Sequence, residues 1–168
     1  MQRFSLLMRN ILEFSDMDFI SLKNDIDFIQ KYLELQQLNH EFAFEFELTI
    51  AESLDTEHLL IPPMLIQPDV ENAILHGALS HKNGKVSIDY SCKENQIIIS
   101  IQDNGDTGVS RSRNAGKLHR SMSTSITKKR IKNFREVHDL DIQYRPIENL
   151  AVKSGKRVVF TIPFRYLS

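Results

Sequence analysis

Three short stretches of this 168-residue chain hold side chains that could do chemistry. Residues 71–77 read ENAILHG, so a carboxylate, an amide and an imidazole interrupt a run that is otherwise apolar. Residues 103–105 read DNG and follow an apolar run, and residues 121–125 read SMSTS. Hydroxyls at the start of a helix suit the binding of phosphate, because backbone N–H groups are unpaired there and the helix dipole is positive.

Each stretch also has an explanation that involves no ligand, and the residue types alone leave both open. Asn72 and His76 lie four positions apart, so they can share the solvent-facing side of a helix. Asn-Gly is a strong signal for a hairpin turn, although no strand pattern follows it closely here. The hydroxyls of residues 121–125 can serve as ordinary helix caps.

Composition narrows the classes of function. The chain has 21 Lys and Arg against 22 Asp and Glu, so no global field draws it onto nucleic acid or an anionic membrane. The basic run at residues 128–130 fits a solvated helix face. Cys92 is the single cysteine, which excludes an internal disulfide and a cysteine-rich zinc site. Cys92 is explained as a small apolar residue at a strand end. The sequence shows no nucleophile–base pair that includes it.

The first 40 residues are predicted to form two amphipathic helices. Apolar residues recur at three- and four-residue steps across residues 4–14. These helices either pack on their own domain or belong to a truncated dimerisation bundle, and periodicity does not decide between the two. The chain starts within a helical pattern, so we expect further sequence upstream. The second helix begins with a Ser21 cap, and its apolar stripe is Leu22, Ile26, Ile29 and Leu33.

The rest of the chain predicts an α+β fold. Residues 64–76 indicate a helix that ends at Gly77, and its first turn could instead begin near Pro68. Residues 103–120 have the profile of a long cationic loop, and a helix is expected over residues 121–137. About five strands are expected, at residues 42–50, 86–90, 97–101, 141–145 and 157–164.

The strands and helices together predict a two-layer sandwich, with helices on one face of the sheet. The first strand alternates apolar and mostly polar residues, and Phe42, Phe44 and Phe46 share one of its faces. We expect these three rings to belong to the core, because a strand that covers a core on one side produces the same pattern.

Taken together and in this order, the three polar stretches resemble those of the LytS-type sensor histidine kinases, which signal to LytTR-type response regulators. The likeness rests on the run IPPMLIQPDVENAILHG at residues 61–77, on DNG, and on HRSMS followed by ITKKRI between residues 119 and 131. It extends along nearly the whole chain through short matches at residues 20–23, 32–36 and 154–158.

This resemblance implies the Bergerat ATP-binding fold: a mixed sheet of about five strands on one side, helices on the other, and two helices ahead of it. The nucleotide would lie between the helices, beneath a lid formed by residues 106–120. The cofactors implied are ATP and Mg²⁺.

The resemblance also implies a role for individual residues. Asn72 matches the asparagine whose side-chain oxygen ligates Mg²⁺, and Glu71 would lie near the metal or polarise a water, so the two are the catalytic candidates. Asp103 matches the aspartate that accepts a hydrogen bond from the adenine amino group, and Gly105 would let the backbone approach the purine. The remaining nucleotide-binding candidates are His76, Gly108, Ser121, Ser123 and Thr124.

Several positions depart from the family pattern and support a different class of function. Thr107 stands where a second glycine is usual, although Gly108 is adjacent, and Ser123 stands in the second glycine motif. Lys156 replaces a frequent threonine, and Asp69 replaces a common apolar or aromatic residue. The alternative is therefore a degenerate, non-catalytic kinase-like domain that serves as a dimerisation and signal-relay module.

None of the histidines has the setting of the family's phosphoacceptor. We therefore expect residues 1–40 to be the remnant of the dimerisation and phosphoacceptor region, and residues 41–168 to be the ATP-binding catalytic domain. The phosphate would pass to a histidine upstream and then to a LytTR-type response regulator. The resemblance implies a homodimer through the N-terminal helices. It places the chain in the cytoplasmic portion of a receptor anchored in the inner membrane by segments upstream.

Overall fold

A mixed five-stranded sheet forms one layer of the molecule. The computed structural model describes residues 9, 11–105, 115–148 and 155–166, with only the backbone of residues 115–123 and of residue 148. The strand order is β2-β4-β5-β7-β6; β2 runs parallel to β4, and all other neighbours are antiparallel. The predicted sheet is confirmed, with strands β2 (Phe44–Ile50), β4 (Gly84–Lys93), β5 (Gln96–Asp103), β6 (Gln143–Glu148) and β7 (Lys156–Pro163).

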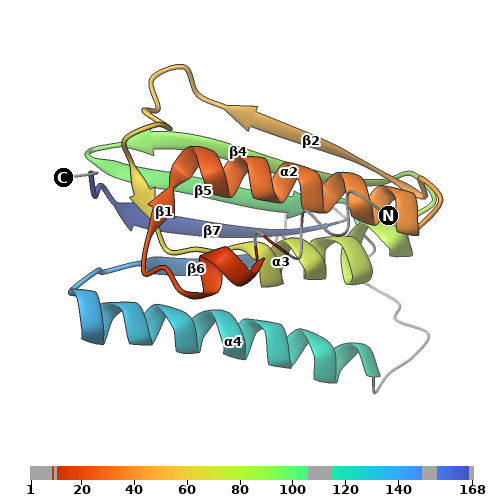
Figure 1. Ribbon diagram of the computed structural model, residues 1–168. Coiled ribbons are helices and arrows are strands. Elements are labelled where there is room, and N and C mark those ends of the chain that lie inside the picture. The colour runs from red at the N-terminus through yellow and green to blue at the C-terminus, as the bar shows by residue number, and fades with distance from the viewer. Residues whose placement is uncertain (1–8, 10, 106–114, 149–154, 167–168) are drawn as a thin grey trace.

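The helices lie together on one face of this sheet (Figure 1). On β4 the side chains of Val86, Ile88 and Tyr90 are buried beneath them, whereas Lys85 and Asp89 on the other face are exposed. This alternation is the period of two that a half-covered strand requires. The helical elements are α2 (Leu22–Asn39), α3 (Gln67–Asn72), the π-helical η1 (Ala73–Gly77), the 3₁₀-helical η2 (Ala78–Ser80) and α4 (Ala115–His138).

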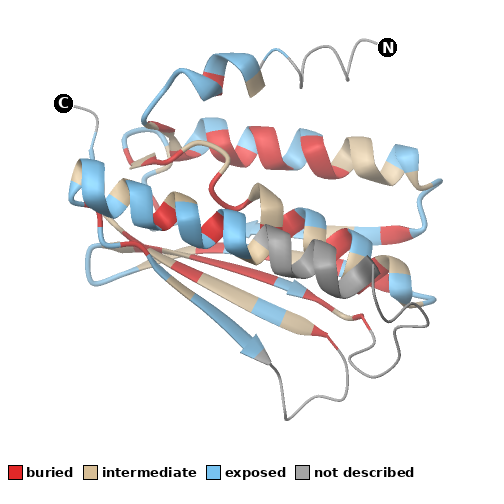
Figure 2. Ribbon diagram, turned by 90° about the horizontal axis from the view of Figure 1, so that it is seen from below, coloured by how far each residue is buried: buried red, intermediate tan, exposed pale blue. Residues whose placement is uncertain are grey.

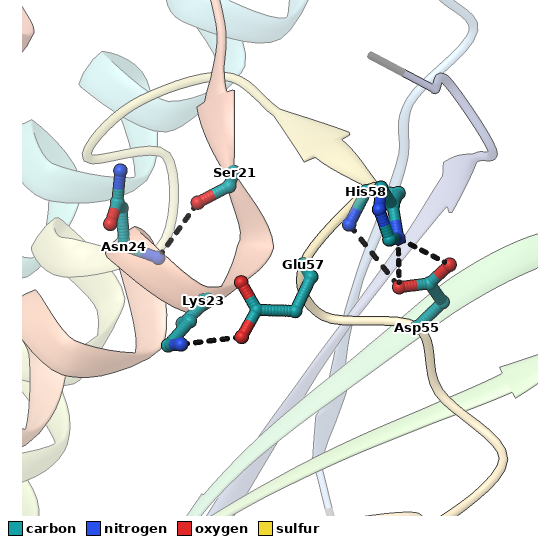
Figure 3. Close-up of polar contacts among 6 residues, drawn as sticks. All are labelled: Ser21, Lys23, Asn24, Asp55, Glu57 and His58. Carbon is teal, nitrogen blue, oxygen red and sulfur yellow. Dashed lines mark hydrogen bonds and ion pairs between the residues drawn. The ribbon is translucent and has the colours of Figure 1, made fainter.

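Helix α2 packs on its own domain and shares its core. The four residues of its predicted apolar stripe are all buried. Figure 2 shows buried segments in red along this helix. The Ser21 cap is confirmed, because its hydroxyl accepts a hydrogen bond from the Asn24 N–H at 3.2 Å (Figure 3). The structure therefore shows α2 packed on its own domain, and the assignment of residues 1–40 to a dimerisation region stays a prediction.

A loop and a short sheet hold the start of α2 in place. The N–H groups of Leu22 and Lys23 donate to the carbonyls of Leu59 and Thr56 at 2.8 and 2.9 Å. These bonds satisfy donors that a helix leaves unpaired in its first turn. The Lys23 ammonium also pairs with Glu57 (Figure 3). Strands β1 (Ile20–Ser21) and β3 (Leu60–Ile61) pair alongside, which the sequence did not predict. Residues 11–15 of the first predicted helix are helical, and most of the remainder lies outside the described residues.

Four local predictions are wrong. Phe42 is 66% exposed rather than part of the core, because Glu41 and Phe42 adopt positive φ in the turn between α2 and β2. The alternative first turn near Pro68 is confirmed, because the helix begins at Gln67. It continues past Gly77 to Ser80 as η1 and η2.

The last two corrections concern α4. This helix begins at Ala115, six residues before Ser121, because Ala, Lys, Leu and Arg between residues 115 and 120 favour helix. Within the predicted solvated run, Arg130 donates from Nη1 to the carbonyl of Met64 at 2.6 Å and so braces the loop that leads into α3. No helix in the described part of the chain is long and apolar enough to cross a membrane.

Candidate functional site

A cavity of about 200 Å³ lies between the helices and the sheet. Helices contribute one side of it, and the ends of three adjacent strands contribute the other. Its walls are mostly apolar, with a few polar groups, which is the usual character of a small-molecule site. The lining residues are Asp69, Asn72 and Ala73 (α3 and η1), Thr124 (α4), Ile101 and Asp103 (β5), Tyr144, Pro146 and Ile147 (β6), and Lys156, Arg157 and Val158 (β7).

Asp103 sits at the carboxyl end of β5 and is only 7% exposed. Its Oδ1 accepts a hydrogen bond from the backbone N–H of Gly105 at 2.9 Å. A Cβ placed on Gly77 would lie 2.3 Å from Asp103 Cγ, so only glycine lets η1 pass this close to the carboxylate. The role of Gly77 is therefore close packing against Asp103 rather than the end of a helix.

Two further glycines complete the surroundings of Asp103. A Cβ on Gly105 would lie 2.5 Å from the Gly77 carbonyl oxygen. The Gly155 N–H donates to the Gly105 carbonyl at 2.7 Å, and a Cβ on Gly155 would lie 2.0 Å from the Asp103 carbonyl oxygen. Gly155 also has a φ of +94°, which side chains rarely adopt. We call Gly77, Gly105 and Gly155 the glycine cradle, because their bare backbones fix Asp103 at the cavity.

The amide of Asn104 holds the neighbouring strand end. Its Oδ1 accepts from the Lys85 N–H at 2.6 Å, and its Nδ2 donates to the Asn83 carbonyl at 2.7 Å. These bonds tie the end of β5 to the start of β4. Asn104 therefore supports the position of Asp103 from the edge of the sheet, rather than forming the tip of a tight hairpin.

A second carboxylate, Asp69, lies in the same cavity and is 5% exposed. Its Oδ1 accepts from the Tyr144 hydroxyl and its Oδ2 from the Thr127 hydroxyl, both at 2.8 Å. Burial raises the pKa of the Asp69 carboxyl, and the two hydrogen bonds act in the opposite direction. Burial is also the main reason why the pKa of Tyr144 is raised.

The structure brings four of the predicted site residues together. Asn72, Asp103 and Thr124 line the cavity, and Gly105 is bonded to Asp103. Glu71 is exposed and outside the lining, and its charge helps to raise the pKa of Tyr32 on α2, after burial.

His76 is half-buried and also lies outside the lining. Gly108 falls outside the described residues. Ser121 and Ser123 lie within α4, but their side chains are outside the described part. Because α4 begins at Ala115, neither serine stands at a helix N-terminus.

Sequence reasoning missed Tyr144 and the part played by Gly77, and it noted Asp69 only as a departure from a pattern. The available signal was the carboxylate of Asp69, between Pro68 and Val70. A charged side chain is rarely buried unless it has partners. Tyr144 carries no local signal, since its partner Asp69 is 75 residues away.

No model of a known protein family matches the chain. The sensor histidine kinase/phosphatase LytS of Staphylococcus aureus strain MRSA252 is 33% identical over 125 residues, which cover 73% of this chain and 20% of that protein. The chain spans less than half the length of the curated relatives that it matches first.

Solved structures share the fold. The catalytic domain of histidine kinase ThkA, in a nucleotide-free form, superposes with a TM-score of 0.54 and 16% identity, covering 86% of this chain and 94% of that one. Full-length ShkA, solved in complex with AMPPNP, gives a TM-score of 0.60 at 14% identity, over 96% of this chain and 36% of that one. The predicted α+β sandwich is therefore the fold of histidine kinase catalytic domains.

Proposed function

Because this chain is related to the LytS-type sensor histidine kinases and has the fold of histidine kinase catalytic domains, we propose that it binds ATP with Mg²⁺ for phosphotransfer. The γ-phosphate would pass to a histidine upstream of residue 1, in the same subunit or a partner subunit. A response regulator of the LytTR type would then receive it.

The observation that carries this proposal is Asp103 in its glycine cradle at the wall of the cavity. A carboxylate has about four lone-pair sites, so Asp103 can accept a hydrogen bond from an exocyclic amine while it accepts one from the Gly105 N–H. The volume of about 200 Å³ is below the roughly 300–1,000 Å³ of sites that enclose a drug-sized ligand. The cavity would therefore enclose the base, and the sugar and phosphates would extend beyond it.

The donor set also fits Mg²⁺ bound together with phosphate. Asn72 lines the cavity, and its amide oxygen is a suitable ligand for a hard cation. Among the described residues, no group of three or more His, Cys, Asp and Glu side chains could hold a metal ion. Magnesium of this kind is commonly held by one or two protein oxygens, water and nucleotide phosphates, and it would neutralise charge on the phosphates.

The work of this chain would then be to bind and orient the nucleotide. Asp103 selects the base and Asn72 places the metal ligand at the helix that borders the cavity. In phosphoryl transfer, positioning and charge neutralisation supply most of the acceleration. Glu71 stays a candidate for polarising a water near the metal, and it is the less supported of the two because it lies outside the cavity lining.

Calorimetry with Mg-ATP tests the proposal. Asp103→Ala removes a charge-assisted hydrogen bond of about 1.5–3 kcal/mol, so we expect the Kd to rise about 10- to 150-fold. Asn72→Ala should weaken Mg-ATP more than ATP without metal. Asp89→Asn, on the exposed face of β4, is the matched control and should bind as the unmodified chain does. No binding heat with millimolar Mg-ATP, or equal affinity in all four proteins, would contradict the proposal.

One observation favours a second candidate, a non-catalytic dimerisation and relay module. Helix α4 is continuous from Ala115 through Ser123, where the resemblance places a glycine motif. A longer chain that includes the upstream histidine distinguishes the two. Transfer of label from γ-labelled ATP to that histidine supports the kinase, and ATP binding without transfer supports the relay module.

Dimerisation and anchoring belong to the same proposal. Leu12 and Met17, ahead of α2, are 66% and 50% exposed, so apolar surface is available for a second copy of the chain. We propose a homodimer through this N-terminal segment, in the cytoplasmic portion of a receptor that is anchored in the inner membrane by upstream segments. Sedimentation of chains with and without residues 1–20 tests the dimer.

A further inference from the structure

A partly buried polar network joins α3, α4 and β6 at the cavity; we call Asp69, Thr124, Thr127 and Tyr144 the Asp69 network. Asp69 accepts from Tyr144 and from Thr127 at 2.8 Å each. The Thr124 hydroxyl acts on the Tyr144 hydroxyl and lowers its pKa, against the effect of burial. Three of the four residues line the cavity. Both oxygens of Asp69 thus face protein donors.

The Tyr144 ring is held from two directions. Its tip is bonded to Asp69 at 2.8 Å. Its side packs on Phe160, a fully buried residue of β7, with ring centroids 5.1 Å apart and planes at 60°. A ring fixed in this way presents a preformed aromatic wall to the cavity, and preorganisation of this kind lowers the cost of binding.

Stability alone does not explain a carboxylate at this position. A buried charge is costly, and apolar residues of similar volume often serve a core equally well or better. The apolar neighbours of Asp69 in the chain, Val70 and Ile66, are fully buried, so this region of the core accommodates apolar side chains. What a carboxylate adds is direction, because two acceptor oxygens determine where the hydroxyls of Tyr144 and Thr127 point.

We propose that Asp69 is a positioning residue of the nucleotide site, which holds the Tyr144 ring as the wall against which the purine lies. This inference rests on the proposed function and deepens it, since it concerns recognition of the base. Asp103 would accept a hydrogen bond from the edge of the base, and the Tyr144 ring would contact its face. Contact between a base and an aromatic face strengthens binding whatever the identity of the base.

Tyrosine emission provides a readout that a purely structural role would not move. The chain has four tyrosines and no tryptophan, so its intrinsic emission comes from tyrosine. We expect Mg-ADP to quench part of this emission, and Tyr144→Phe to abolish the quenching. Tyr166→Phe removes an exposed tyrosine that is not among the residues lining the cavity, and it should keep the quenching. Quenching that persists in Tyr144→Phe would overturn the placement of the base.

A double-mutant cycle tests the part played by Asp69. Asp69→Leu and Tyr144→Phe should each raise the Kd for Mg-ATP about three- to tenfold, because each releases the ring. The double variant should bind no more weakly than the weaker single variant, since both changes remove the same bond. Multiplied effects, or no effect of Asp69→Leu, would overturn the proposal.

Folding and the proposed function are controlled separately. Asp69→Asn keeps the shape and one acceptor oxygen, so it should fold where Asp69→Leu does not, and it should weaken binding by a smaller factor. The melting temperature of each variant, measured without nucleotide, reports whether that variant is folded. If the unmodified chain binds no Mg-ATP, the proposed function fails. If the unmodified chain binds and the folded variants bind equally well, only the role of Asp69 fails.

Discussion

Asp25 offers the sharpest test of the energetics of this fold. It lies on α2 and is fully buried, and neither of its carboxylate oxygens has a hydrogen-bond partner among the described residues. The Tyr90 hydroxyl is also buried and has no hydrogen-bond partner among the described residues. Burial, and after it the charge of Asp25, raises the pKa of Tyr90. Burial raises the pKa of Asp25 from 3.8 to about 7. Ionised Asp25 therefore destabilises the packing of α2 on the sheet.

The sign follows from proton binding. Because the pKa in the folded state exceeds that in the unfolded state, the folded chain holds an extra proton between about pH 4 and pH 7. The contribution of Asp25 to the free energy of unfolding thus falls as the pH rises through this window, and it levels off above about pH 7. Each pH unit within the window is worth about 1.4 kcal/mol, so the whole effect is about 4 kcal/mol.

Asp25→Asn isolates this contribution, because asparagine has the shape of aspartic acid and does not ionise. Urea unfolding followed by circular dichroism should show Asp25→Asn gaining about 3 kcal/mol on the unmodified chain between pH 5 and pH 8. Asp27→Asn, on the exposed side of the same helix, should track the unmodified chain at every pH. A difference for Asp25→Asn that stays constant with pH would refute the reasoning.

The remaining predictions concern the cradle and the helix cap. Gly77→Ala forces a Cβ to 2.3 Å from Asp103 Cγ, so it should cost about 1–3 kcal/mol of stability and weaken Mg-ATP about tenfold or more. Melting and calorimetry check this against Leu75→Ala, an exposed position two residues before, and wild-type affinity in Gly77→Ala would disprove it. Ser21→Ala removes the bond to the Asn24 N–H and should cost about 1 kcal/mol in urea unfolding. Ser21→Asp, which keeps an acceptor, should restore the loss, and equal stability of all three would show that the cap is unimportant.

Local patterns in the sequence determined most of the elements. The alternation in β4 and the stripe from Leu22 to Leu33 are properties of near neighbours, so they could be identified without knowledge of the fold. The cap at Ser21 is local for the same reason. The order of the polar stretches also brought Asn72 and Asp103 to attention, through their resemblance to a family rather than through their chemistry alone.

Element boundaries were decided by the surroundings of each segment. Phe42 continues the alternation of β2, yet the turn after α2 takes it out of the strand. Helix α4 extends back to Ala115, into a segment that composition describes as a loop. In both cases the local pattern permits two structures, and the neighbouring element selects one.

The composition of the candidate site was decided only by tertiary structure. Gly77, Gly105 and Gly155 meet at Asp103 because β5 lies beside β7 and beneath η1. Asp69 finds its partners 58 and 75 residues away, on α4 and β6. Contacts of this range depend on sheet register and helix packing, which no spacing within a segment encodes. The sequence could therefore name the residues able to do the chemistry, whereas only the fold could show which of them share one cavity.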